Sequence, residues 1–187
     1  MGDFMDFFDL HCDTLTECMD DGDSLLKNKR DIDFERGKIF GRWNQVFAVF
    51  IPDSMDDSLV ESYFDSACDF YLSELKKKGD FFPILSAEDV RGHSRGVMLA
   101  MESSRGVGSL ERLEKLYERG LRLITLTWNH KNRAAGGCDE GGGLTDWGRE
   151  LVSKMEKLGI VTDVSHLSDR SFYDLCEFSD APFIASH

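Results

Sequence analysis

The stretch Pro182-Phe183-Ile184-Ala185-Ser186-His187 is apolar and strand-like, and it stops on a histidine, a residue type that binds metal ions. Three other runs stop in a similar way: residues 7–13 on a histidine and an aspartate, residues 160–166 on a histidine, and residues 96–102 on a glutamate. In a parallel barrel the carboxyl ends of all strands meet at one rim. The four runs therefore predict buried parallel strands with metal ligands gathered at that rim.

The composition is that of an ordered globular protein. Hydrophobic residues make up 41% of the 187 residues and aromatic residues 11%, and no run approaches the roughly 20 apolar residues of a membrane span. The net charge of -13 opposes binding to nucleic acid or to an anionic membrane. Residues 1–6 carry acids where a secretory signal carries bases, so we expect a cytoplasmic protein.

The cysteines do not form a recognisable framework. Their number is odd and no two have the spacing of a zinc-binding pair, which argues against disulfides and a thiolate zinc site. We expect reduced thiols that mostly pack in the interior. The five are Cys12, Cys18, Cys68, Cys138 and Cys176.

Strand-like and helix-like patterns alternate along the chain, without a linker rich in proline or serine. This alternation predicts one α/β domain over residues 1–187. Helical spacing covers residues 60–75, with Gly79 as the expected stop, and the helix 169–178 has Ser168 as its cap. The other expected helices are 110–118 and 146–158. A polar excursion to about Arg42 follows the first strand. The later expected strands are 45–51, 97–101, 121–127, 160–164 and 183–186, and residues 81–85 form a short extended segment.

This order predicts a TIM-like (β/α)8 barrel of the metal-dependent hydrolase type, present as an incomplete barrel. The chain offers roughly six strands, whereas a closed barrel has eight and typically about 250 residues. We therefore expect the C-terminal strands and helices to be missing. A doubly wound open sheet is the alternative, but no glycine-rich phosphate fingerprint follows the first strand.

The ligand types suit two metal ions. His11 and Asp13 lie two residues apart, so on an extended strand their side chains share a face and can meet at one cation. His166 and His187 come from later strand ends and can hold a second cation, while Glu102 can bridge the two through its separate oxygens. Mixed imidazole and carboxylate ligands favour Zn²⁺, although Co²⁺ or Mn²⁺ would also fit.

Several motifs together resemble the renal (membrane) dipeptidase family, peptidase family M19, in its soluble bacterial-type form. The resemblance runs in order through nearly the whole chain. It rests on His11-Cys12-Asp13-Thr14, Asp31-Ile32-Asp33-Phe34, Asn44-Gln45-Val46-Phe47-Ala48-Val49-Phe50, Leu126-Thr127-Trp128-Asn129-His130, Gly143-Leu144-Thr145-Asp146-Trp147-Gly148, Thr162-Asp163-Val164-Ser165-His166-Leu167-Ser168 and Ile184-Ala185-Ser186-His187.

The resemblance implies a barrel with two zinc ions. His11 and Asp13 would bind one ion, His166 and His187 the other, and Glu102 both. The implied reaction is attack of a metal hydroxide on the peptide bond of a dipeptide, with Glu102 positioning the hydroxide. Barrels of this kind often form dimers, so a homodimer is one assembly that the chain could form.

The sequence also departs from the family pattern. Where family members usually have a substrate-contacting histidine after the Leu-Thr pair, this chain has Trp128. We expect Trp128 to contact the substrate and His130 to bind it and to donate to the developing oxyanion, the alternative being that His130 is an exposed loop histidine. The family's substrate-binding arginine and a later acidic residue are absent. Another binuclear amidohydrolase, such as a deacetylase or lactonase, and a non-catalytic metal-binding fragment remain the rival functions.

Overall fold

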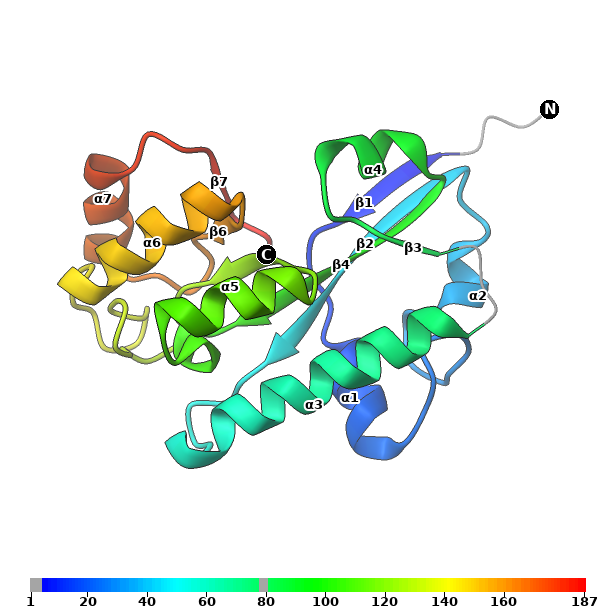
Figure 1. Cartoon of the computed structure of the whole chain (residues 1–187), viewed down its shortest axis with the longest axis horizontal. Helices are drawn as coiled ribbons and strands as arrows, with labels where there is room; N and C mark the ends of the chain where they lie inside the picture. Colours follow the sequence, from blue (N-terminus) through cyan, green and yellow to red (C-terminus); the bar gives the residue numbers. More distant parts are fainter. Residues whose placement is uncertain (1–4, 78–80) are drawn as a thin grey trace.

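The structure is built on a parallel sheet whose main strands lie side by side in chain order (Figure 1). It is a computed structural model, and it describes residues 5–77 and 81–187. The strands lie in the order β1-β2-β4-β5-β6-β7, and every pairing between them is parallel. Their bounds are β1 Asp6–Asp9, β2 Arg42–Phe50, β3 Phe82–Pro83, β4 Arg95–Glu102, β5 Leu121–Thr125, β6 Val161–Asp163 and β7 Phe183–Ile184.

The strand order follows the chain order and never reverses, apart from the short β3, which pairs with the beginning of β4. A doubly wound sheet would reverse at a switch point. The arrangement is therefore a parallel half-barrel, and the expected incomplete barrel is confirmed.

Helices cover one side of this half-barrel. In Figure 1, α3, α5, α6 and α7 follow one another along the outside of the sheet. The bounds are α1 Thr14–Asp21, α2 Phe34–Gly37, α3 Asp57–Lys76, α4 Ala87–Gly92, the 3-10 helix η1 Ser104–Val107, α5 Leu110–Glu118, α6 Asp146–Leu158 and α7 Asp169–Phe178. Among the described residues, no helix is both long enough and apolar enough to span a membrane.

The alternation of side chains along the strands separates two apolar regions. On β2, Phe47 and Val49 pack in the large core beneath the helices, whereas Val46 and Ala48 belong to a smaller cluster on the inner side of the half-barrel. Ala100 on β4 lies in the same inner cluster. Because successive residues of a strand point to opposite faces, Glu102 follows Ala100 on the inner side, at the end of the strand.

The sequence interpretation located the long helices but not the short ones. The segment between the first strand and Arg42 was expected to be a polar excursion, yet it contains α1 and α2, and α4 was also not expected. The helix α2 has an N-cap signal, since the Asp33 carboxylate accepts a hydrogen bond from the Arg36 amide at 2.7 Å. The expected cap Ser168 is observed, and Asp56 caps α3. Gly79, the expected end of α3, lies outside the described residues.

Candidate metal centre

The five predicted ligands come from four strand ends and meet in one cleft. His11 and Asp13 follow β1, and Glu102 is the last residue of β4. His166 and His187 follow β6 and β7. The cleft has a volume of about 410 Å³. It is lined by Asp9, His11, Asp13, Phe50, Glu102, Trp128, His166, Ser186 and His187.

Glu102 lies at the centre of this group and turns its two oxygens in different directions. Its Oε2 is 3.4 Å from His11 Nε2, which in turn is 3.4 Å from Asp13 Oδ1. Its Oε1 is 3.2 Å from His166 Nε2 and 3.8 Å from His187 Nε2. The glutamate is only 3% exposed. One carboxylate oxygen therefore serves the His11 and Asp13 side of the cleft, and the other serves the His166 and His187 side.

The Nε2 atoms of His166 and His187 point toward each other. Their Nε2 atoms are 2.8 Å apart, while each Nδ1 has a partner of its own. The Nδ1 of His166 is 2.9 Å from the amide oxygen of Asn129, and the Nδ1 of His187 is 2.8 Å from Ser186 Oγ. Since an amide oxygen only accepts, His166 Nδ1 is the donor, and its Nε2 is directed into the cleft toward Glu102 and His187.

The backbone at His166 is held in an unusual conformation. Its φ is 64°, in the left-handed region that costs a non-glycine residue about 1 to 3 kcal/mol. The His166 carbonyl accepts hydrogen bonds from the amide of Cys138 at 2.9 Å and from Thr127 Oγ1 at 3.2 Å. These two bonds, from different segments of one loop, hold the strained residue in place.

His11 and Glu102 stabilise each other's charged forms in this cluster. Burial alone would lower the pKa of His11, but the hydrogen bonds and charges of Asp13 and Glu102 outweigh it and raise the pKa to about 10. Burial would raise the pKa of Glu102, yet hydrogen bonds from His11 and His166 bring it down to about 2. Burial, followed by the charge of His11, lowers the pKa of His187. Glu102 is therefore ionised at neutral pH, and a metal ion would compete with a proton for His11.

Beneath the ligands lies a polar network that the sequence interpretation did not single out. Asp163 at the end of β6 is fully buried. Its carboxylate accepts from Thr125 Oγ1 at 2.7 Å, from the amide and hydroxyl of Ser165 at 3.0 and 2.8 Å, and from the amide and hydroxyl of Ser186 at 3.1 and 2.6 Å. The signal in the sequence was the pairing of Asp-Val-Ser-His with Ala-Ser-His, because Asp163, Ser165 and Ser186 of these motifs belong to the network.

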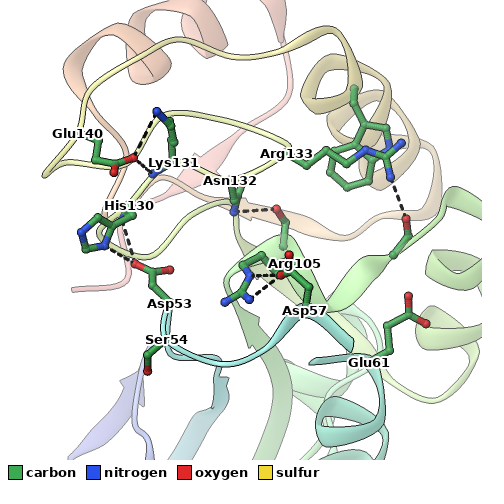
Figure 2. Close-up of a pocket in the computed structure, with 13 residues that line it drawn as sticks. Asp53, Ser54, Asp57, Glu61, Arg105, His130, Lys131, Asn132, Arg133 and Glu140 are labelled. Atoms are coloured by element: carbon green, nitrogen blue, oxygen red, sulfur yellow. Dashed lines mark hydrogen bonds and ion pairs between the residues drawn. The ribbon is translucent and has the colours of Figure 1, made fainter. Parts of the chain in front are cut away.

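Trp128 and His130, the two predicted substrate contacts, lie in different pockets. Trp128 lines the cleft of the ligands, where its ring packs edge-on against Phe50 with centroids 4.9 Å apart. His130 lines a neighbouring pocket of about 810 Å³, in which its Nδ1 and its backbone amide both contact Asp53 Oδ2, at 2.7 and 3.0 Å (Figure 2). This contact raises the pKa of His130. The structure does not bring His130 to the ligand cluster, and its role at an oxyanion stays a prediction.

A parallel barrel that carries imidazole and carboxylate ligands at the carboxyl ends of its strands has the architecture of the barrel metal-dependent hydrolases. Residues 3–187 match the model of the membrane dipeptidase family, peptidase family M19. The chain therefore belongs to this family, and the resemblance seen in the motifs is confirmed.

Solved structures have the same fold. A metallo peptidase from Rhodobacter sphaeroides, liganded with a phosphinate mimic of the dipeptide L-Ala-D-Ala, is 22% identical with a TM-score of 0.84, over 99% of this chain and 65% of that one. The dipeptidase AC, a family M19 metallo peptidase, is 24% identical with a TM-score of 0.86, over 98% of this chain and 63% of that one.

Curated relatives match shorter stretches. An uncharacterized dipeptidase of Schizosaccharomyces pombe is 39% identical over 85 residues, which cover 42% of this chain and 20% of the relative. The matches with three curated relatives cover between 20% and 43% of the relatives' own lengths.

Proposed function

We propose that the cluster binds two zinc ions and that the protein hydrolyses dipeptides. The observation that carries this proposal is the position of Glu102, whose two oxygens face two separate groups of ligands. A carboxylate in this position can bridge two cations, as binuclear hydrolytic sites require. Membership of the family supports the reaction class.

The residues present fit the metal by their chemistry. Three imidazoles and two carboxylates are a donor set that zinc accepts. The ligand atoms of His11, Glu102 and His187 all lie within 4.8 Å of one another, close enough to surround an ion. His11 and Asp13 would hold one zinc, His166 and His187 the other, and Glu102 both.

The side chains of this chain would orient the substrate around that centre. When bound, two zinc ions would supply a hydroxide nucleophile at neutral pH and polarise the substrate carbonyl. The cleft of about 410 Å³ falls within the usual range for small-molecule sites. We propose that Trp128, packed on Phe50, contacts a substrate side chain, and that His130 reaches the substrate after leaving Asp53.

Elemental analysis of the purified protein is expected to find about two zinc ions per chain, because the donor set divides into two groups around Glu102. The His166→Ala variant should retain about one. No loss in His166→Ala, or the same loss in the control variant below, would mean that the metal is adventitious. His93→Ala is the matched control, because His93 stacks on Phe82 outside the cluster.

Hydrolysis of a substrate panel separates the proposed activity from its rivals. Free dipeptides, including L-Ala-D-Ala, are expected to be cleaved at least about a hundredfold faster than N-acyl amino acids or lactones, since the proposed reaction breaks a peptide bond within a small cleft. Release of free amino acids is the measurement. Activity confined to the N-acyl compounds or lactones would assign another amidohydrolase function, and metal binding without any hydrolysis would favour a non-catalytic role.

A further inference from the structure

A continuous route of short hydrogen bonds leads from a buried carboxylate to the ring of His187. Ser186 Oγ lies 2.6 Å from Asp163 Oδ2 and 2.8 Å from His187 Nδ1. Asp163 is fully buried, and its carboxylate also accepts hydrogen bonds from the hydroxyls of Thr125 and Ser165. Since an ionised carboxylate has no proton to give, the hydroxyl of Ser186 must be the donor toward Asp163.

This direction determines the proton position on His187. A hydroxyl has one proton, and that of Ser186 is used on Asp163, so its oxygen can only accept from His187 Nδ1. The neighbouring Ser165 hydroxyl lies 3.3 Å from Ser186 Oγ, but it has a closer acceptor in Asp163 Oδ1 at 2.8 Å. His187 therefore carries its proton on Nδ1. Its Nε2 therefore has the lone pair; it lies 2.8 Å from His166 Nε2, from which it can accept, and 3.8 Å from Glu102 Oε1.

Asn129 likewise holds a proton on Nδ1 of His166, by a different route. The Asn129 amide oxygen accepts from His166 Nδ1, and it also lies 3.6 Å from the Cys138 thiol, a second donor. The backbone of Asn129 is fixed by the amide of Asp139, which donates to its carbonyl at 2.9 Å. A β-carbon at Gly137 would lie 2.4 Å from that carbonyl oxygen, so the loop packs tightly on Asn129.

We propose that Ser186, oriented by Asp163, and Asn129 are positioning residues that hold the Nδ1 protons of His187 and His166 and so direct both Nε2 atoms toward a bound metal. The proposal rests on the metal centre proposed above. A histidine that ligates metal commonly donates its other ring nitrogen to a carboxylate, carbonyl or water, and removing such a partner costs about ten- to a hundredfold in metal affinity. Here the partner of His187 is a serine hydroxyl that transmits the orientation of a buried aspartate.

Ser165 supplies a matched control. It is a buried serine whose hydroxyl donates to the same carboxylate, and its oxygen also accepts from the amides of Ser186 and His187, at 3.0 and 3.3 Å. No contact of its side chain with the His187 ring is present among the described residues. If the serines act only by stabilising the fold, Ser165→Ala should be the more harmful change, because Ser165 makes more contacts. If Ser186 sets the tautomer, Ser186→Ala should be the more harmful change for zinc binding.

The test compares Ser186→Ala, Ser165→Ala and Ser186→Thr in two measurements. Two-bond ¹H–¹⁵N NMR spectra of the metal-free protein report which ring nitrogen of His187 is protonated, and competition with a chromophoric chelator reports zinc affinity. We expect Nδ1 protonation in the native protein, its loss in Ser186→Ala with zinc binding about tenfold weaker, and near-native values in Ser186→Thr. Ser165→Ala should keep the tautomer and stay within about threefold in affinity.

Native tautomer and affinity in Ser186→Ala, or an equal loss in Ser165→Ala, would overturn the proposal. Asn129→Ala and Asn129→Asp extend the test to a partly exposed residue, whose replacement does not open the core. These variants keep the proposal testable if Ser186→Ala does not fold. Only Asn129→Asp should preserve the His166 tautomer, because it retains an acceptor. If the native protein bound no zinc, the metal centre would be wrong, while the tautomers would still decide the positioning role.

Discussion

Replacing Glu102 by glutamine is expected to weaken zinc binding roughly a thousandfold and to abolish measurable dipeptide hydrolysis. The side chain is 3% exposed and ionised, with one oxygen toward His11 and the other toward His166. Removing one partner from a buried charged group costs about 3 to 5 kcal/mol, and 1.4 kcal/mol corresponds to about a tenfold change in affinity. Glutamine keeps the shape but offers a single neutral acceptor. Chelator competition and release of amino acids from a dipeptide measure the two effects.

Glu74→Gln is the control for losing a buried carboxylate. Glu74 is 2% exposed, but it accepts from Ser24 and from the amide of Leu25, outside the cleft. This variant should be less stable and should keep its zinc. Zinc affinity within about threefold of native in Glu102→Gln would contradict the bridging role and would leave the proposed binuclear centre without its central observation.

The meeting of the candidate ligands could be predicted because the ends of parallel strands follow a simple rule. Hydrophobic runs mark buried strands, and in a parallel sheet the residues that follow them share one edge. His11, Glu102, His166 and His187 each follow such a run, so sequence order alone indicates that they meet. The structure brings them within a single cleft.

The contacts behind the ligands could not be predicted in the same way. The loop between β5 and α6 has no periodicity, so nothing in the sequence tells that Asn129 reaches the His166 ring or that His130 turns to Asp53. The sequence does not predict the left-handed backbone of His166 either, because histidine is uncommon in this conformation and loop contacts hold it there. The helices α1, α2 and α4 are too short for their periodicity to be read against charged surroundings.

Replacing Asp163 by alanine is expected to lower the free energy of unfolding by about 3 to 5 kcal/mol. The carboxylate joins the end of β6 to Thr125 on β5 and to Ser186 after β7, and it is fully buried. Alanine would leave the amide of Ser165 without its acceptor and the amide of Ser186 with Ser165 Oγ alone, and an unsatisfied buried donor costs about 1 to 3 kcal/mol. Urea unfolding at pH 7, followed by circular dichroism, measures the loss.

Asp163→Asn separates the charge from the hydrogen bonds, because its amide oxygen can still accept from the two backbone amides while the hydroxyls of Thr125 and Ser186 turn round. It should lose less free energy of unfolding than Asp163→Ala.

The hydrogen bonds of Ser186, Ser165 and Thr125 hold the pKa of Asp163 below its ordinary value of 3.8 despite burial. A depressed pKa gives stability that is present above the unfolded-state value and is lost as the pH falls through the folded-state value. The difference between native protein and Asp163→Asn should therefore stay constant from pH 7 to about 4 and shrink below it. A difference that persisted unchanged into acid would mean that the charge of Asp163 does not stabilise the strand ends, and that the carboxylate holds Ser186 by its shape alone.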